Sequence, residues 1–353
     1  MQKIYGYQDE ADCAYLLKSG AVYFDIKEKE LYKISGKNLI IAAGELILNY
    51  NSDAYCYRAY NFYKDENAEL AQISPENLKR LALNYGVGFN MNIFFAQMIR
   101  MTNKILAKRQ SAISGDVKTV HDISGIYYEI TNSLLDIAKK TKFPDIIQLG
   151  EKLKNELIYE TGRIFSQQKS PVKMQMGKKD SDAFNISFAP ESVICNEGEQ
   201  GNEMYILNHG RIGVLINGNK VAEIDQPGTV IGEIALLLGE TRTATLKAND
   251  QVELSVIKKD NLQAFHKSRE KFFLEIGETL SKRINNNFEI INDIDKRSGE
   301  KPDQKVAGFL TKDRAEKYLI QIEKDICELY RKKEYEQLID TIKKAKDAKE
   351  KYI

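Results

Sequence analysis

Cysteine and histidine are scarce in this chain of 353 residues. Its four cysteines, Cys13, Cys56, Cys195 and Cys327, are scattered with no short Cys-x-x-Cys spacing, and its three histidines lie far apart in sequence. Zinc sites and disulfide scaffolds bring such residues together at short, regular spacings. The sequence therefore predicts neither a metal site nor a disulfide framework.

The short motifs of common enzymes are also absent. The chain has no glycine-rich nucleotide loop followed by lysine, no Gly-x-Ser-x-Gly elbow and no kinase signature. The three histidines lie far apart in sequence, and the metal ligands of a phosphodiesterase are missing. We therefore expect no catalytic residue, no cofactor and no enzyme activity.

Long apolar runs and an excess of one charge are lacking as well. No run reaches the length of about 20 residues that spans a bilayer, and the first residues lack the apolar core of a signal peptide. The net charge of +1 gives no global field for nucleic acid or anionic membranes. We expect a cytoplasmic protein of two or three domains, with no membrane span and no nucleic-acid partner.

What the chain does contain is a compact set of anion-binding groups between Gly232 and Thr245. A Gly-Glu pair is followed, ten residues after the glycine, by the segment Arg242-Thr-Ala-Thr. A guanidinium group and free backbone amides hold a phosphate in charge-assisted hydrogen bonds, while a carboxylate accepts a hydrogen bond from a sugar hydroxyl. The loop predicts a site for a cyclic phosphodiester on a ribose. The alternative is that Glu233 neutralises Arg242 in a structural ion pair.

Short β-rich segments surround this loop. Residues 204–214 are typical of a strand, a glycine turn at Gly210 and a second strand, and residues 221–224 and 252–257 add further strands. Such strands favour a small roll or barrel. With the loop in its order and spacing, residues 184–295 resemble the cyclic nucleotide-binding domain family, as in the catabolite activator protein and the regulatory subunits of protein kinase A.

This resemblance implies particular ligand contacts. Glu233, with the backbone of Gly232, would hold the ribose 2′-hydroxyl, and Arg242 would pair with the cyclic phosphate. Counting forward from Arg242 places Ile284, Asn287 and Phe288 beside the purine. The implied ligand set is Gly232, Glu233, Ile234, Ala235, Arg242, Thr243, Ala244 and Asn287. The expected ligand is cAMP or cGMP, since the Thr243 hydroxyl permits a guanine, and a cyclic dinucleotide is an alternative.

The first third of the chain repeats this module. Residues 14–22 match residues 204–212 at an offset of 190, and residues 58–62 echo residues 242–246 at an offset of 184. The first copy has four extra residues between its glycine and its arginine, and Tyr60 stands where the second copy has Ala244. We therefore interpret residues 1–110 as a degenerate module.

The degenerate copy leaves two hypotheses open. Its corresponding site residues are Gly44, Glu45, Arg58 and Ala59. It either binds nothing or still binds a ligand. That ligand could differ from the one at the second module, with stacking faces from Tyr50, Tyr55, Tyr57, Tyr60 and Tyr63. We favour tyrosines that pack within the strands of a small roll.

Helical patterns fill the rest of the chain. Apolar residues spaced by three and four predict two helices in residues 111–183, which end in a loop over 166–182 and which we expect to cover the first module. The same spacing from Phe273 to Ile291 predicts the helix that follows the second module. Residues 296–353 predict a hairpin of helices 313–332 and 334–352. The fold class is α+β, with two β-roll (jelly-roll-like) modules linked by helices and a C-terminal helical hairpin.

The expected function is regulatory. Ligand at the second module would reposition its C-terminal helix and change contacts with an unknown protein partner through the helical regions. The mixed charges of the tail favour such docking over DNA reading, and a homodimer is a further alternative. Other hypotheses are a Crp/Fnr-like transcription regulator with an unrecognised DNA-binding part, and a structural tandem protein with inactive pockets.

Overall fold

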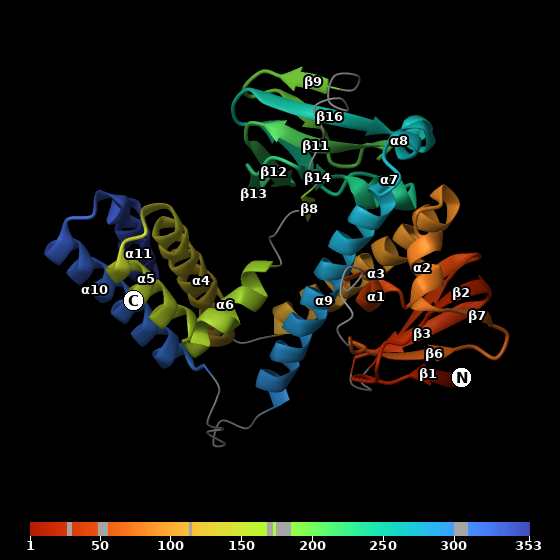
Figure 1. The fold of residues 1–353 in the computed structure, drawn as a ribbon, viewed down its shortest axis with the longest axis horizontal. Helices are drawn as coiled ribbons and strands as arrows, with labels where there is room; N and C mark the ends of the chain where they lie inside the picture. The colour runs from red at the N-terminus through yellow and green to blue at the C-terminus, as the bar shows by residue number, and fades with distance from the viewer. Residues whose placement is uncertain (27–29, 49–55, 113–114, 168–171, 174–184, 300–309) are drawn as a thin grey trace. The chain divides into compact units, whose positions relative to one another are not determined.

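The computed structural model describes residues 1–26, 30–48, 56–112, 115–167, 172–173, 185–299 and 310–353. The chain divides into two compact units (Figure 1). The module unit comprises Met1–Asn103 and Pro171–Phe288, and the helical unit comprises Lys104–Ser170 and Glu289–Ile353. Every strand pairing in the described residues is antiparallel, and helices accompany the sheets, so the predicted α+β class is confirmed.

The first module occupies residues up to Asn103. Its elements are β1 (Gln2–Tyr5), β2 (Ala14–Ser19), β3 (Ala21–Asp25), β4 (Leu31–Ser35), β5 (Leu39–Ile41), α1 (Gly44–Leu48), β6 (Asn61–Lys64), β7 (Glu69–Ile73), α2 (Pro75–Leu81) and α3 (Tyr85–Ala112). The strands form two sheets, ordered β1-β6-β3-β4 and β5-β2-β7. Apolar side chains of both sheets, such as Leu17 and Phe24, are fully buried and form the core. Helix α2 begins where the Ser74 hydroxyl caps the amide of Asn77.

The second module follows the same plan. Its elements are β8 (Val172–Lys173), β9 (Asn185–Phe188), β10 (Val193–Cys195), β11 (Glu203–His209), β12 (Ile212–Ile216), β13 (Asn219–Ile224), β14 (Thr229–Ile231), α7 (Glu233–Leu238), β15 (Thr245–Ala248), β16 (Val252–Lys258), η1 (Lys259–Asn261), α8 (Leu262–Ser268) and α9 (Phe272–Gly299). Its sheets are ordered β10-β15-β12-β13 and β8-β14-β11-β16-β9.

The two modules share the register of their matching strands. Tyr15 pairs with Ile41 across β2 and β5, and Tyr205 pairs with Ile231 across β11 and β14, so both partners keep the offset of 190. The turn glycines Gly20 and Gly210 have φ values of 96° and 98°, a region that favours glycine. The predicted duplication is confirmed.

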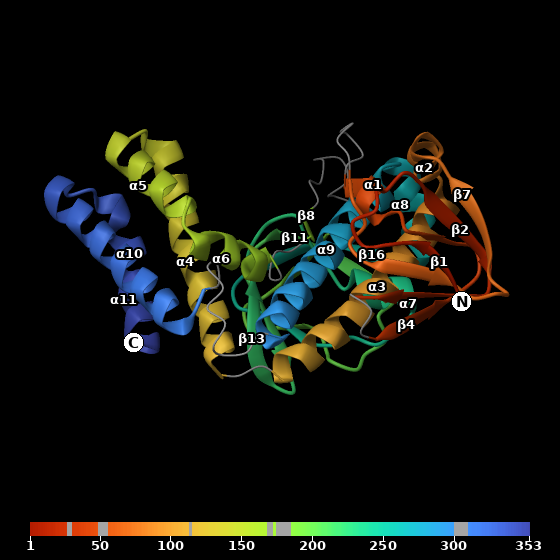
Figure 2. The same ribbon diagram turned by 90° about the horizontal axis from the view of Figure 1, so that it is seen from below.

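The helical unit has one apolar core. Its helices are α4 (Gly115–Thr141), α5 (Pro144–Lys154), α6 (Leu157–Gln167), α10 (Lys312–Lys333), the short η2 (Glu336–Leu338) and α11 (Ile339–Tyr352), which lie together in Figure 2. Its fully buried residues include Ile123 and Ile130 of α4 and Leu319 and Ile322 of α10. The C-terminal hairpin is confirmed, and Glu334 ends α10 with a left-handed φ of 53°.

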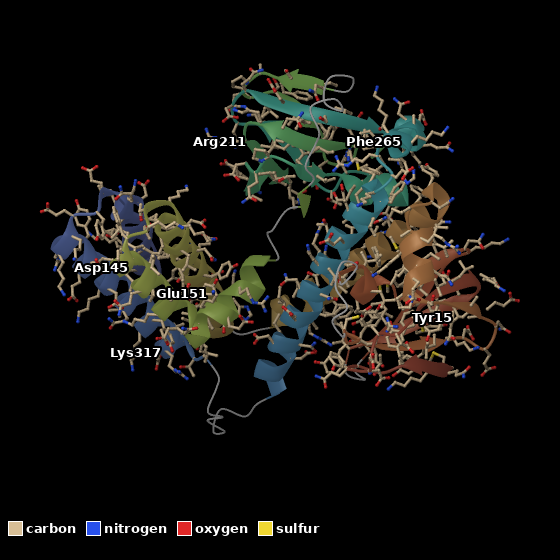
Figure 3. All side chains as sticks on the ribbon, in the orientation of Figure 1. Tyr15, Asp145, Glu151, Arg211, Phe265 and Lys317 are labelled. Atoms are coloured by element: carbon tan, nitrogen blue, oxygen red, sulfur yellow. The ribbon has the colours of Figure 1, made fainter. Side chains whose placement is uncertain are left out.

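The sequence predicted that the helices after residue 111 cover the first module. In the structure they form part of the core of the helical unit instead. Helices α4 and α5 pack against α10 and α11, and α6 packs against α4. Asp145 of α5, labelled in Figure 3, accepts a hydrogen bond from Tyr335 at 3.2 Å, and the rings of Phe143 and Tyr335 stack at 4.4 Å. The expected loop over 166–182 lies largely outside the described residues. Within the described helices, none has the length and hydropathy of a membrane span.

Candidate functional site

The site loop begins at Gly232, between β14 and α7. Gly232 has a φ of 84°, in the left-handed region, and provides the N-cap of α7. A Cβ atom at this position would lie 2.1 Å from Nη1 of Arg242. Only glycine satisfies both constraints, because other residues bring backbone strain and a steric clash. Glycine at this point lets the arginine lie directly against the turn.

Glu233 is held by a helix that follows the module. Its carboxylate is buried, and its Oε1 accepts a hydrogen bond from Nη1 of Arg283 on α9 at 2.6 Å. The Arg283 side chain is 30% exposed and that of Glu233 is 5% exposed. This ion pair neutralises the carboxylate and ties α9 to the start of α7. Arg283 was not predicted from the sequence, because no local pattern pairs residues fifty positions apart.

Arg242 is buried and bound to carbonyl oxygens. Its Nη2 donates to the carbonyl oxygen of Glu203 at 2.6 Å, its Nη1 lies 3.3 Å from the carbonyl oxygen of Gly232, and its guanidinium lies 5.2 Å from the centre of the Tyr205 ring. Across the described residues, no carboxylate forms an ion pair with Arg242. The alternative of a structural Glu233–Arg242 pair is therefore not what the structure contains. A buried guanidinium without a counterion is costly unless an anion binds there.

Backbone contacts fix the position of Arg242. Its amide donates to the carbonyl oxygen of Glu199 at 2.7 Å, and its carbonyl oxygen accepts from the amide of Gly198 at 2.9 Å. A Cβ atom on Gly201 would lie 2.5 Å from Cβ of Ala235, so the loop before β11 packs closely on α7. Ile234, Ala235 and Ala244 are half-buried and Thr243 is exposed. Seven of the eight predicted residues thus lie in one short loop.

Asn287 is the eighth, and it lies on α9. Its side chain is buried, and its Nδ2 donates to Thr102 Oγ1 and to Asn103 Oδ1 of α3, each at 2.8 Å. The side-chain amide of Asn287 therefore joins α9 to α3. The reading of a base edge by Asn287 stays a prediction.

The corresponding groups of the first module pair with each other. Arg58 and Glu45 are both buried, with Nη1 3.3 Å from Oε2, and Arg58 also donates to the carbonyl oxygens of Ala42 and Cys13. The amide of Ala59 lies 3.4 Å from Glu45 Oε1, and the Arg58 guanidinium lies 4.4 Å above the Tyr5 ring. The arginine is thus neutralised within the module, unlike Arg242.

Tyr60 belongs to an aromatic cluster, which comprises Tyr5, Phe24, Tyr60, Phe62 and Phe288. The ring of Tyr60 stacks on Phe288 of α9 at 4.9 Å with an interplanar angle of 24°. Burial raises the pKa of both Tyr60 and Tyr5. The packing role that we favoured for the tyrosines holds for Tyr60. Tyr57 is 63% exposed, and Tyr50 and Tyr55 lie outside the described residues.

The described part of the chain has no group of three or more His, Cys, Asp or Glu side chains placed to hold a metal ion. The site loop and α9 together supply two guanidinium groups and one carboxylate, those of Arg242, Arg283 and Glu233. The formal charges of these three side chains sum to +1.

Comparison with known proteins identifies the module. Residues 185–269 match the family model of the cyclic nucleotide-binding domain. The human cyclic nucleotide-gated channel beta-3 is 38% identical over 84 residues, which cover 22% of this chain and 10% of that protein. The mouse potassium/sodium hyperpolarization-activated cyclic nucleotide-gated channel 2 is 38% identical over 74 residues, 21% of this chain and 8% of that protein. The chain therefore spans about a tenth of the length of these curated relatives.

Solved structures cover more of the chain with less similarity. The cAMP-bound PfPKA-R fragment is 18% identical, covers 83% of this chain and 77% of its own, and has a TM-score of 0.26. The regulatory domain of Toxoplasma gondii PKA with cAMP is 16% identical, covers 77% of this chain and 80% of its own, and has a TM-score of 0.22. Residues 185–269 are thus similar to cyclic nucleotide-binding domains, and the first module repeats the strand register of the second with an altered site loop.

Proposed function

We propose that this chain is a non-catalytic, cyclic nucleotide-responsive regulatory protein whose second module binds cAMP or cGMP. The observation that carries the proposal is the state of Arg242. It is buried, positioned by backbone contacts and lacks a carboxylate partner among the described residues, while the neighbouring Glu233 is neutralised by Arg283. A cyclic phosphodiester supplies the single negative charge that the loop leaves unbalanced.

The charges also favour a particular size of ligand. A cyclic mononucleotide carries one negative charge and a cyclic dinucleotide carries two, against the net charge of +1 of Arg242, Arg283 and Glu233. Glu233 keeps a second oxygen for the ribose 2′-hydroxyl, since a carboxylate offers about four acceptor positions. We therefore rank cAMP and cGMP ahead of a cyclic dinucleotide, which is the second candidate ligand.

Calorimetry of the full chain tests this assignment. The purified protein is titrated with cAMP, cGMP and cyclic dinucleotides, and the titrations are repeated with Arg242→Ala. Arg211→Ala is the matched control, because Arg211 lies in the same module in an exposed pair with Asp250 at 2.8 Å. We expect Arg242→Ala to lose affinity at least about a hundredfold, the magnitude for loss of a charge-assisted contact with a buried partner. Equal affinities of Arg242→Ala and Arg211→Ala would refute the ligand assignment.

The regulatory step of the proposal concerns α9. Bound nucleotide orders the loop from Gly232 to Thr245, and the Arg283–Glu233 pair carries that change to α9. Hydrogen exchange over residues 272–295 should decrease when nucleotide saturates the chain. Identical exchange with and without nucleotide would show that α9 takes no part.

The helical unit supplies the output in this proposal. Its helices present mixed charges, with acidic and basic side chains paired along α10 and α11. We propose that it docks a protein partner in the cytoplasm rather than DNA. Steep salt dependence combined with sequence-selective DNA affinity would favour the transcription-regulator alternative.

A further inference from the structure

Helix α9 contacts the site loops of both modules. Arg283 binds Glu233 of the second module. Within two turns on either side of it, Ser281 lies against Gly44 of the first module and Phe288 stacks on Tyr60. A Cβ atom on Gly44 would lie 3.4 Å from the hydroxyl oxygen of Ser281. The two loops are therefore joined through a single helical segment.

Of the contacts that α9 makes with the first module's site loop, the aromatic contact of Phe288 is the most extensive. Phe288 is 1% exposed, and its ring also meets Phe24 edge to face at 6.1 Å. Buried aromatic side chains contribute large apolar areas and specific ring geometry. By contrast, the reciprocal contact between α3 and the second loop, Arg100 with Glu240, is a solvent-exposed ion pair and adds little. Phe288 therefore holds this part of α9 on the first module, together with the hydrogen bonds of Asn287 to α3.

The site residues of the first module already bind each other, and this pairing explains the role of the degenerate copy. Arg58 is already engaged by Glu45 and by two carbonyl oxygens, and Tyr60 turns its ring to α9. An incoming phosphate would have to break a buried ion pair, which is unfavourable. The first module presents a docking surface in place of an open anion site.

The geometry points to the first module as an internal partner that sets the nucleotide affinity of the second. Docking of Phe288 on Tyr60 holds Arg283 beside Glu233, and the neutralised Glu233 tolerates the negative phosphate. Nucleotide binding and Phe288 docking consequently stabilise each other, because coupling between two sites is reciprocal. This inference rests on the proposed function, since it needs nucleotide to bind at the second loop.

The test changes the first module and measures binding at the second. Tyr60→Ala and Phe288→Ala are each titrated with cAMP and cGMP in the full chain, alongside the wild type. We expect both variants to bind about 5-fold to about 100-fold more weakly, the usual range of coupling between sites. Tyr60→Phe keeps the ring and should retain the wild-type affinity. Leu17→Ala is the matched control, because Leu17 is fully buried in β2, in the other sheet of the first module.

The outcomes separate this inference from the proposed function. If the wild type binds and Tyr60→Ala and Phe288→Ala bind as tightly as Leu17→Ala, the coupling is refuted while the proposed function stands. If the wild type binds neither nucleotide, the proposed function fails and the inference fails with it. If circular dichroism shows that the alanine variants are unfolded, the coupling is tested in the wild type instead. Amide hydrogen exchange of β6 is then compared with and without nucleotide. Greater protection with nucleotide supports the coupling, and unchanged protection overturns it.

Discussion

Removal of the Arg283 side chain tests the ion pair that neutralises Glu233. In Arg283→Ala the carboxylate of Glu233, whose side chain is 5% exposed, loses its cationic partner. Breaking a fully buried ion pair costs about 3–5 kcal/mol, and an exposed pair is worth about 0.2–1 kcal/mol. Because the Arg283 side chain is 30% exposed and water reaches it, we expect a loss of folding stability between these limits, of about 1–3 kcal/mol.

The same change should weaken nucleotide binding. An un-neutralised Glu233 repels the cyclic phosphate that Arg242 attracts, and a penalty of about 1–2 kcal/mol corresponds to about a 5-fold to 30-fold rise in Kd. Urea unfolding measures the stability and calorimetry with cAMP and cGMP measures the affinity. Arg211→Ala serves again as the arginine-to-alanine control.

A double variant identifies the cause. In Arg283→Ala with Glu233→Gln no carboxylate is left without a counterion, so the stability loss should be smaller than in Arg283→Ala alone. Arg283→Ala with the stability and affinity of Arg211→Ala would refute the reasoning. So would a double variant no more stable than Arg283→Ala.

Four further predictions follow from the same geometry. Gly232→Ala should bind nucleotide at least about tenfold more weakly and lose about 1–3 kcal/mol of stability, because its Cβ atom would lie 2.1 Å from Arg242. Gly239→Ala is the control in the same titrations and should keep its affinity. Gly239 has a φ of 66°, and its Cβ atom would meet no atom nearer than Lys259 Nζ at 3.7 Å. Calorimetry should give a stoichiometry of about one nucleotide per chain, since Arg58 is already paired with Glu45, and a value of two would contradict a closed first pocket. Burial raises the pKa of Tyr60, so the folded state holds this proton more tightly than the unfolded chain, whose tyrosines ionise near about pH 10. The contribution of Tyr60 to stability should therefore be intact below that pH and fall above it. The urea midpoint should decline less steeply with pH in Tyr60→Phe than in the wild type. Ile322→Ala should destabilise the helical unit by about 2–5 kcal/mol in thermal unfolding, because Ile322 is fully buried in its core, and a change below about 1 kcal/mol would contradict that core.

Local spacing predicted β11, β12, β13, β16 and α9 of the second module, but not its remaining strands. The glycine turn at Gly210, the interval from Gly232 to Arg242 and the apolar stripe from Phe273 to Ile291 each depend on neighbouring residues. A constant offset also predicted the shared register of the two modules, since Tyr15 and Tyr205 occupy matching positions in their sheets. Backbone geometry of this kind is set within a few residues.

Partners distant in the sequence were not predictable in the same way. The pairing of Glu233 with Arg283 and the stacking of Tyr60 on Phe288 join residues that share no motif. An amphipathic stripe such as Ile123, Tyr127 and Ile130 predicts that one face of a helix is buried. It does not specify the element that buries it, which is why the association of α4 with α10 needed the structure.

The discontinuous sequence of the two units has a practical consequence for the design of truncated proteins. Each unit draws on two separate segments, so no single cleavage point divides the protein into its natural halves. A fragment that stops at residue 295 would keep the nucleotide-binding module and would expose the apolar faces of α4 and α5, which α10 and α11 normally cover. Exposed faces of that kind promote aggregation. A sensor fragment is better made by deleting residues 113–170 together with the tail, so that α4, α5 and α6 are removed along with α10 and α11.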